Sequence, residues 1–460
     1  MIQKSILDAL QKIVGPRHLL VQKEDMLTYS YDAAVLDPVM PAAAVMPEKT
    51  DQLGEIIALC RKYRIPLTVR GSGTNLSGGT IPEASGIVVL TGRLNKIIEI
   101  NAEDMYTVVE PGVVTAILAA EVEKQGLFYP PDPGSMAVST LGGNVAENAG
   151  GLRGLKYGVT KDYVMGLQFF DAQGNQVKTG SRTVKCATGY NLTGLMVGSE
   201  GTLGVLEQIT LKLIPAPRHR QAMVAVYDTI EAASETVAGI ISSRILPATL
   251  EILDNFTIRA VEDFSKAGLP TDAAALLLIE VDGHPAVVAE EAEQVKALCL
   301  KMGARSIDQA KDDAQRDKIW AARRAALSAL AQLKPTLVLE DATVPRSRIP
   351  DMVRALQRIG QKYRIDIGTF GHAGDGNLHP TILTDRRNKE EFLRVEQAIE
   401  EIFDVALSMG GTLSGEHGTG IAKAPFLEKE AGYSSILFSR QLRAALDPDH
   451  ILNPGKITGV

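Results

Sequence analysis

Apolar and polar residues follow two different patterns along the chain, which change near residue 217. Before that point, short apolar runs bounded by glycine, proline or asparagine predict strands, and one stretch of helical periodicity is ended by a glycine. The expected elements are strands at residues 66–70, 86–90, 96–100, 106–110, 164–171, 176–178 and 205–214, and a helix at 113–125. The sequence Pro-Ala-Pro at 215–217 then predicts a domain boundary.

Beyond residue 217, apolar residues recur at helical spacing over longer stretches that alternate with short apolar strands. We expect helices at residues 229–243, 285–302, 313–333, 349–363 and 389–409, and strands at 250–253, 276–281, 336–339 and 365–370. This alternation is typical of a sheet covered by helices, and an antiparallel ferredoxin-like sheet fits the order. The predicted fold class is α+β, with an α/β part and a mixed sheet in the first domain.

The N-terminal residues 1–14 place Ile2, Ile6, Leu10 and Ile13 at helical spacing, which predicts an amphipathic helix and no signal peptide. Apolar runs are far shorter than the ~20 residues that span a bilayer. The net charge of −7 argues against general nucleic-acid binding, and three widely separated cysteines exclude a disulfide framework or a cysteine-ligated cluster within the chain. We expect a cytoplasmic protein, with peripheral attachment to a membrane complex left open.

Glycines gather in three loops that could approach an anion closely. They are RGSGTNLSGG at 70–79, PPDPGS at 130–135 with TLGGNVAENAGG at 140–151, and GSEGTLGV at 198–205. Backbone amides that no Cβ shields can surround phosphate oxygens. The first loop alone leaves a structural turn and an anion site equally open, and it matches neither GxGxxG nor a Walker loop. Three such loops in one domain indicate a ligand longer than a mononucleotide.

Two further glycine-rich motifs carry histidines. They are GHAGDGNLH at 371–379 and SGEHGTG at 414–420, and they hold three of the seven histidines of the chain. Two imidazoles and one carboxylate suit Zn, Fe or Mn and leave coordination positions open for a substrate. The alternative is that each histidine simply hydrogen-bonds a turn. HExxH is absent, which argues against a zincin-type protease.

In order and spacing, the three glycine loops resemble the FAD-binding domain of the p-cresol methylhydroxylase/vanillyl-alcohol oxidase superfamily. Together with the histidine motifs and the segment NPGK at 453–456, the chain resembles the FAD- and metal-dependent D-2-hydroxyacid dehydrogenases of that superfamily, which include D-lactate dehydrogenases and the glycolate oxidase flavoprotein subunit. The resemblance implies an FAD-binding domain at 1–217 (core about 37–217) and a substrate- and metal-binding domain at 218–460, with the tail 447–460 returning to the flavin. Because Thr74 and Asn75 stand where a covalently linked His would lie, FAD is expected to be non-covalent.

The resemblance also assigns roles to single residues. The implied metal ligands are His372, His379 and Glu416, the implied base is His417, and Asn377 would face substrate or flavin. The expected FAD contacts are Arg70, Gly71, Ser72, Gly73, Thr74, Asn75, Ser77, Gly78, Pro131, Asp132, Gly134, Ser135, Thr140, Gly142, Gly143, Asn144, Asn148, Gly151, Glu200, Gly201, Gly204, Val205, Asn453 and Lys456.

The implied reaction is the oxidation of a 2-hydroxy acid that chelates a divalent metal. Coordination lowers the hydroxyl pKa, His417 accepts the proton, and the Cα hydride passes to the flavin. The segment WAARR at 320–324 offers Arg323, and next to it Arg324, as the fork that binds the substrate carboxylate. Thr381 and Leu327 replace polar contacts that a dicarboxylate would need, so D-lactate or glycolate is preferred and D-2-hydroxyglutarate is the alternative.

The chain has no haem, iron–sulfur or dinucleotide motif of its own, so the electrons must leave to oxygen, a quinone or a partner protein. The resemblance favours a protein partner, either electron-transferring flavoprotein or an iron–sulfur subunit. A homodimer is left open. The competing interpretations are a flavin-free metallohydrolase, a non-catalytic FAD subunit and an aryl-alcohol oxidase with covalent flavin.

Overall fold

The computed structural model describes residues 2–459, so residue 1 of the predicted N-terminal helix lies outside the described part. The chain forms two compact units that interrupt one another along the sequence. The first comprises Met1–Ala149, Val159–Ala216 and Glu416–Val460, and the second comprises Gly150–Gly158 and Pro217–Gly415. The assignment of FAD to the first domain and of substrate and metal to the second stays a prediction.

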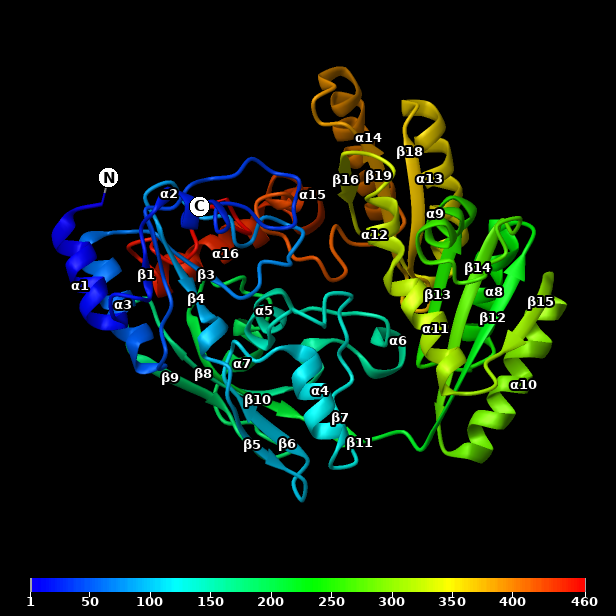
Figure 1. Cartoon of the computed structure of the whole chain (residues 1–460), viewed down its shortest axis with the longest axis horizontal. Helices are drawn as coiled ribbons and strands as arrows, with labels where there is room; N and C mark the ends of the chain where they lie inside the picture. The colour runs from blue at the N-terminus through cyan, green and yellow to red at the C-terminus, as the bar shows by residue number, and fades with distance from the viewer. Residues whose placement is uncertain (1, 460) are drawn as a thin grey trace. The chain divides into compact units, whose positions relative to one another are not determined.

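The first unit contains three sheets, with strand orders β1-β2-β4-β3, β5-β6-β10-β8-β9 and β11-β7 (Figure 1). Its strands are β1 (Leu19–Leu20), β2 (Ala43–Val45), β3 (Leu67–Arg70), β4 (Ile87–Leu90), β5 (Ile97–Asn101), β6 (Tyr106–Val109), β7 (Leu127–Phe128), β8 (Val164–Phe170), β9 (Gln176–Gly180), β10 (Val205–Lys212) and β11 (Ile214–Pro215). Its helices are α1 (Lys4–Val14), α2 (Lys23–Leu27), α3 (Asp51–Tyr63), α4 (Thr115–Glu123), α5 (Leu141–Glu147), α7 (Leu192–Met196), α15 (Leu427–Ala431) and α16 (Tyr433–Leu446).

The two ends of the chain share one hydrophobic core in this unit. The buried face of α1, which includes Ile6 and Leu10, packs into the same cluster as α3, β3 and the C-terminal Ile451 and Leu452. Leu452 also forms a parallel bridge with Leu67 at the start of β3. The predicted amphipathic helix is thus confirmed, and the C-terminal segment is part of the core that supports the first glycine loop.

The second unit is built on an eight-stranded sheet with the order β15-β12-β14-β13-β18-β19-β16, in which β17 also pairs with β19. Its strands are β12 (His219–Tyr227), β13 (Thr249–Asp254), β14 (Ala275–Gly283), β15 (Ala304–Gln309), β16 (Thr336–Leu339), β17 (Ala342–Thr343), β18 (Asp366–His372) and β19 (Asn377–Thr384). Its helices are α6 (Gly154–Tyr157), α8 (Ile230–Ser242), α9 (Asn255–Ser265), α10 (Pro285–Lys301), α11 (Asp313–Arg324), α12 (Ala326–Leu330), α13 (Ile349–Tyr363) and α14 (Lys389–Ser408).

Every strand pairing in this sheet is antiparallel, which confirms the predicted sheet type. Helices α9, α11 and α12 pack together over one apolar cluster, and α8, α10, α13 and α14 form a second group. The expected single helix at 313–333 is wrong, because α11 ends at Arg324 and α12 begins at Ala326. No glycine or proline marks that break, and it therefore leaves no signal in the sequence.

Helix α13 shows how the spacing of apolar residues predicts helices in the second unit. Its buried residues include Ile349, Met352, Leu356 and Ile359, whose spacing gives a helix one apolar stripe. The helix ends where Arg364 adopts a left-handed conformation with φ of 53°.

A search of the described helices for a long apolar stretch that could span a bilayer finds none.

Candidate active site

Two predicted metal ligands, His372 and His379, are brought together by the hairpin of β18 and β19. His372 ends β18 opposite Asn377, and His379 lies opposite Phe370. The imidazole centroids are 4.9 Å apart with the rings perpendicular, and both side chains are buried. The turn between them contains Gly376 at φ of 93°, where a Cβ would collide with the carbonyl oxygen of Val344. Glycine is therefore required for the hairpin to close against its neighbour.

His372 is held by a buried carboxylate on the neighbouring strand β13. Its Nδ1 lies 2.7 Å from Oε1 of Glu251, and the Glu251 side chain is fully buried. Burial alone would raise the pKa of the Glu251 carboxyl, but the charges of His372 and Arg323 outweigh it and lower the pKa below its ordinary value. An ionised carboxylate can only accept, so Nδ1 of His372 is the donor and Nε2 is the atom suited to a metal.

Arg323 occupies the other oxygen of the same carboxylate. Its Nε and one Nη each lie 2.6 Å from Oε2 of Glu251, and its guanidinium carbon lies 4.7 Å from the centroid of the Phe370 ring. Arg323 is buried, whereas Arg324 is exposed. The two adjacent arginines thus face different environments, and Arg323 reaches the histidine pair through a shared partner, Glu251.

His379 is served by a second buried carboxylate, which precedes β17. Its Nδ1 lies 3.3 Å from Oδ1 of Asp341, a fully buried side chain. The other oxygen of Asp341 accepts hydrogen bonds from the hydroxyl of Ser414 at 3.0 Å and from the amide of Gly415 at 3.1 Å. The carboxylate therefore connects one histidine to the segment that leads directly to Glu416.

The remaining predicted residues of this region fall into two groups. Glu416 and His417 directly follow Gly415 along the chain and belong to the first unit, and their roles stay predictions. Asn377 is buried in the second unit, where its Oδ1 accepts a hydrogen bond of 2.9 Å from the Thr343 hydroxyl.

The first two glycine loops of the first unit touch one another. A Cβ at Gly71 would collide with the Thr140 hydroxyl, and one at Gly142 would lie 2.6 Å from Cβ of Pro111. By contrast, Gly134 has no atom within 4 Å of its Cβ position, so its backbone is open to a ligand. Close approach between loops together with open backbone fits the cradle that the pyrophosphate and ribityl chain of FAD require.

Several predicted FAD contacts have strong partners within the protein. Asn75 donates 2.9 Å to Asp32, and Arg70 donates 2.7 Å to the carbonyl of Tyr31. Gly151 lies in the segment Gly150–Gly158, which is grouped with the second unit. The hydrogen bonds of Arg70 and Asn75 would support the conformation of the first glycine loop even without a ligand.

The C-terminal motif is tied into the same loops. The side-chain amide of Asn453 donates to the carbonyls of Gly79 at 2.8 Å and Glu200 at 2.7 Å, and Nζ of Lys456 donates to the carbonyl of Ile81 at 2.6 Å. Burial lowers the pKa of Lys456 to about 8. Asn453 and Lys456 thus anchor the C-terminal segment to the first and third glycine loops.

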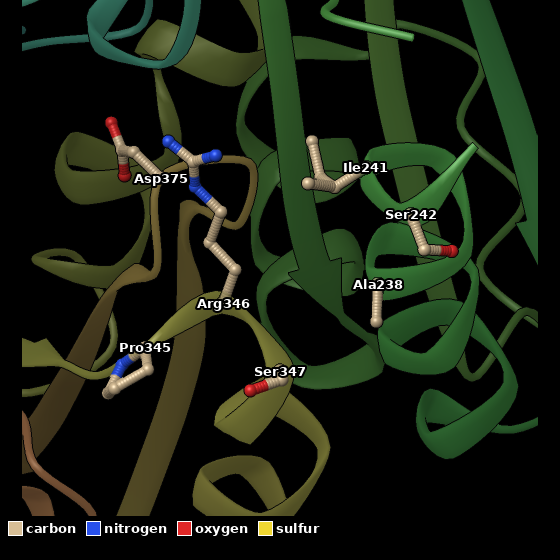
Figure 2. A pocket seen from close by; sticks show the side chains of 7 residues that line it. All are labelled: Ala238, Ile241, Ser242, Pro345, Arg346, Ser347 and Asp375. Atoms are coloured by element: carbon tan, nitrogen blue, oxygen red, sulfur yellow. The ribbon is translucent and has the colours of Figure 1, made fainter. Parts of the chain in front are cut away.

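A separate cavity of about 500 Å³ lies in the second unit (Figure 2). Figure 2 shows the guanidinium of Arg346 beside Asp375. The carboxylate of Asp375 accepts the amide of Asn377 at 3.2 Å. The other lining residues are Ala238, Ile241, Ser242, Pro345 and Ser347. The cavity contains none of the predicted site residues, although Asp375 lies between the two histidines in sequence.

Three acidic residues of these regions were missed by sequence reasoning. Glu251 stands among Leu250, Ile252 and Leu253 in a strand that is buried almost throughout, and a carboxylate in such a strand is a signal that could have been used. Asp341 stands two residues after the end of β16. Glu147, which lies in the second glycine loop, gave no signal because the loop was assigned wholly to the cofactor.

Comparison with known families agrees with this geometry. A family described as "FAD binding domain" matches residues 41–180, and one described as "FAD linked oxidases, C-terminal domain" matches residues 216–457. The chain belongs to the FAD-linked oxidase family. It is therefore an FAD-dependent oxidoreductase, and the flavin-free metallohydrolase is wrong.

Similar proteins extend along the whole chain. Glycolate oxidase subunit GlcD of Bacillus subtilis is 50% identical over 457 residues, covering 99% of this chain and 97% of that protein. The subunit of the same name from Escherichia coli K12 is 37% identical (98% and 90% covered), and D-lactate dehydrogenase of Anaerostipes hadrus is 34% identical (97% and 96% covered). The structure of p-cresol methylhydroxylase with substrate bound matches with a TM-score of 0.83 at 17% identity, covering 99% and 96%. The relatives confirm the predicted likeness to glycolate oxidase flavoprotein subunits and D-lactate dehydrogenases, and the p-cresol methylhydroxylase structure confirms the predicted fold.

Proposed function

We propose that this FAD-dependent oxidoreductase converts a short 2-hydroxy acid, D-lactate or glycolate, to the 2-oxo acid with the help of one divalent metal. The observation that carries the metal is the pair of buried carboxylates behind the two histidines. Glu251 hydrogen-bonds Nδ1 of His372 at 2.7 Å, and Asp341 lies in electrostatic contact with Nδ1 of His379 at 3.3 Å. These contacts support Nε2 of each histidine as the metal ligand, as in carboxylate–histidine–metal sites. Histidines that merely closed a turn would not need a buried anion each.

The third ligand of the proposed site is Glu416. It directly follows Gly415, whose amide is bound to Asp341, so the chain itself keeps Glu416 within one residue of the histidine support. Zn, Fe and Mn all accept two imidazoles and one carboxylate. The metal would lower the pKa of the substrate hydroxyl, and bound FAD would take up the hydride from the substrate carbon.

The protein's own residues bind the substrate and move its proton. His417 would accept the hydroxyl proton, because it adjoins the proposed metal ligand Glu416. Arg323 uses Nε and one Nη for Glu251, so its other Nη group would bind the substrate carboxylate. One guanidinium can thus link substrate binding to the orientation of His372.

Two residues of the second unit, one buried and one half-buried, favour a short substrate. Thr381 is fully buried, and its hydroxyl donates to the carbonyl of His379 at 3.2 Å, so it is occupied by backbone. Leu327 packs against the apolar cluster of the second unit. Neither residue suits a second carboxylate, which favours D-lactate or glycolate over D-2-hydroxyglutarate. Relatives named glycolate oxidase subunit and D-lactate dehydrogenase agree with this choice.

The electrons would pass to a protein partner. Two relatives are named as subunits, which supports an assembly, and either electron-transferring flavoprotein or an iron–sulfur subunit could accept electrons from the reduced cofactor. The cytoplasmic location stays a prediction.

An anaerobic bleaching experiment tests the proposed function. The purified FAD-loaded protein is mixed with D-lactate, L-lactate, glycolate or D-2-hydroxyglutarate, and flavin absorbance is followed with and without a chelator. We expect bleaching by D-lactate or glycolate that chelation abolishes and added metal restores. Bleaching by none of the four would refute the substrate class, and bleaching that survives complete metal removal would refute the role of the metal.

A further inference from the structure

Within the first unit, the buried carboxylate of Glu200 accepts hydrogen bonds from the backbone that follows His417. Oε1 of Glu200 accepts the amide of Thr419 at 2.6 Å, and Oε2 accepts the amide of Gly420 at 2.7 Å. Both oxygens are thus engaged by consecutive backbone amides. Burial raises the pKa of Glu200 to about 7, and these two amides oppose that rise because they stabilise the charged form.

Glu200 is itself fixed from the backbone side. Its φ of 50° is in the left-handed region, which is costly for a residue with a Cβ, and its carbonyl accepts the side-chain amide of Asn453 at 2.7 Å. The oxygen Oδ1 of Asn453 in turn accepts the hydroxyl of Thr68 at 3.1 Å. A strained residue held at both ends is well suited to fix a neighbouring segment.

The backbone of residues 418–420 also has little conformational freedom. Gly418 has φ of 79°, and a Cβ there would collide with Oε2 of Glu147. Gly420 has φ of 52°, and a Cβ there would collide with the carbonyl of Ser77. At positions 418 and 420 the backbone after His417 therefore has room only for glycine. The amides of Thr419 and Gly420 are hydrogen-bonded to Glu200.

We propose that Glu200 is a positioning residue for His417 and not an FAD ligand. The proposal rests on the proposed function, in which His417 takes the substrate proton. Each oxygen of the Glu200 carboxylate already accepts one backbone amide, from Thr419 or Gly420, and a negative charge there would repel the FAD pyrophosphate. Its role is to fix the segment 418–420 and thereby the orientation of the adjacent imidazole.

The test compares Glu200→Gln with Glu207→Gln in the FAD-loaded protein. Gln keeps the size of Glu200 but turns an acceptor into a donor that faces a backbone amide. Glu207 is the matched control, because it is a buried carboxylate in the same unit that accepts the hydroxyl of Thr50 at 3.0 Å and Nε2 of Gln176 at 2.5 Å. Three quantities are measured: bound FAD per protein, hydrogen exchange at residues 417–421, and the anaerobic bleaching rate at increasing glycolate or D-lactate.

We expect E200Q to bind FAD as the wild type does. Amide exchange at 417–421 rises, and the limiting bleaching rate falls roughly ten- to hundredfold, as expected for a lost hydrogen bond to a charged group, with little change in the half-saturating substrate concentration. E207Q leaves all three quantities unchanged. If E200Q does not fold, Glu200→Asp, which keeps the charge but shortens the reach, is measured in the same way and should show the same faster exchange and slower bleaching.

Two results would overturn the proposal. In the first, E200Q loses FAD while the loaded fraction bleaches at the wild-type rate, which would make Glu200 a cofactor ligand. In the second, exchange and bleaching both remain at wild-type values. If the wild-type protein is bleached by no 2-hydroxy acid, the proposed function fails, but exchange and FAD content still decide whether Glu200 holds the segment or the cofactor.

Discussion

Nδ1 of His372 and Oε1 of Glu251 lie 2.7 Å apart on neighbouring strands, and both side chains are buried. An anion in an apolar sheet costs several kcal/mol unless it is paired, and here His372 and Arg323 share that task. The arrangement therefore makes sense as a support for a histidine that must present Nε2 in one fixed direction.

Replacing Glu251 with Gln should weaken metal binding. The amide no longer attracts the Nδ1 proton of His372, and loss of such a support typically lowers metal affinity about 10- to 100-fold. The measurement is competition for Zn²⁺ or Mn²⁺ against a coloured chelator.

The matched control for this change is Glu280→Gln. Glu280 is also buried, on the adjacent strand β14, and accepts Nε1 of Trp320 at 2.7 Å, a bond that Gln can keep. Its metal affinity should equal that of the wild type. Unchanged affinity in the Glu251 variant would show that His372 does not ligate the metal through Nε2.

Asp341→Asn should affect both the metal and the catalytic rate. The carboxylate faces Nδ1 of His379 and holds Ser414 and Gly415, so an amide disturbs the histidine and the approach to Glu416 together. Ser414→Ala removes only one of these hydrogen bonds and should cost about 1 kcal/mol of stability with metal affinity retained. Metal titration and anaerobic bleaching of both variants check this, and equal losses in the two would argue against the His379 support.

Arg323 and Arg324 should behave very differently. Arg323→Ala removes one of the two partners of the buried Glu251 carboxylate and leaves only His372, so we expect a loss of about 3–5 kcal/mol in the free energy of unfolding. Arg324→Ala, at an exposed position, should stay within ~0.5 kcal/mol.

Arg323→Lys separates folding from substrate binding. It keeps a positive charge for Glu251 but loses the planar fork, so the half-saturating substrate concentration should rise while the protein stays folded. Urea unfolding and bleaching titrations measure the two effects. A higher half-saturating concentration in the Arg324→Ala variant alone would assign the substrate carboxylate to Arg324.

The sequence predicted the strands and helices whose signal is local. The stripe of α13 needed only periodicity, the turn residues at 172–175 marked the hairpin of β8 and β9, and glycines marked the loops. The break between α11 and α12 was not predicted, because tertiary packing decides it and no punctuation residue marks it. Helix α9 was missed although Asp254 stands at its N-cap, a signal that could have been used.

The candidate site was predictable as far as its residues carry motifs. His372 and His379 stand in one short glycine-rich run, and a hairpin brings them together. Glu251 lies in β13, 121 residues before His372, and Asp341 lies in the short loop between β16 and β17. The order of the strands in the sheet brings both carboxylates to the histidines. Glu200 shows the converse, since its motif position suggested a cofactor contact whereas its carboxylate binds backbone amides.

The stability of the second unit should depend on pH through Asp254. This buried carboxylate caps α9 by accepting the amide of Thr257 at 2.8 Å, and its other oxygen accepts the amide of Thr369 in β18 at 2.7 Å. Burial nevertheless raises its pKa from 3.8 to about 6. The folded protein thus keeps a proton that the unfolded chain loses near pH 4, so the contribution of Asp254 to stability is full below that pH and is lost as pH rises through about 6.

Asp254→Asn removes this titration and provides its measure. The free energy of unfolding of the wild type minus that of Asp254→Asn should fall by at most about 3 kcal/mol between pH 4 and pH 7. Fluorescence of Trp320, the only tryptophan in the sequence, reports specifically on this unit because its side chain belongs to the core cluster that α9 and β13 share. Asp308→Asn, at an exposed position of β15, is the control for the loss of a carboxylate elsewhere in the same unit. A difference for Asp254→Asn that rises with pH would mean that the two amides dominate over burial and hold the carboxyl ionised.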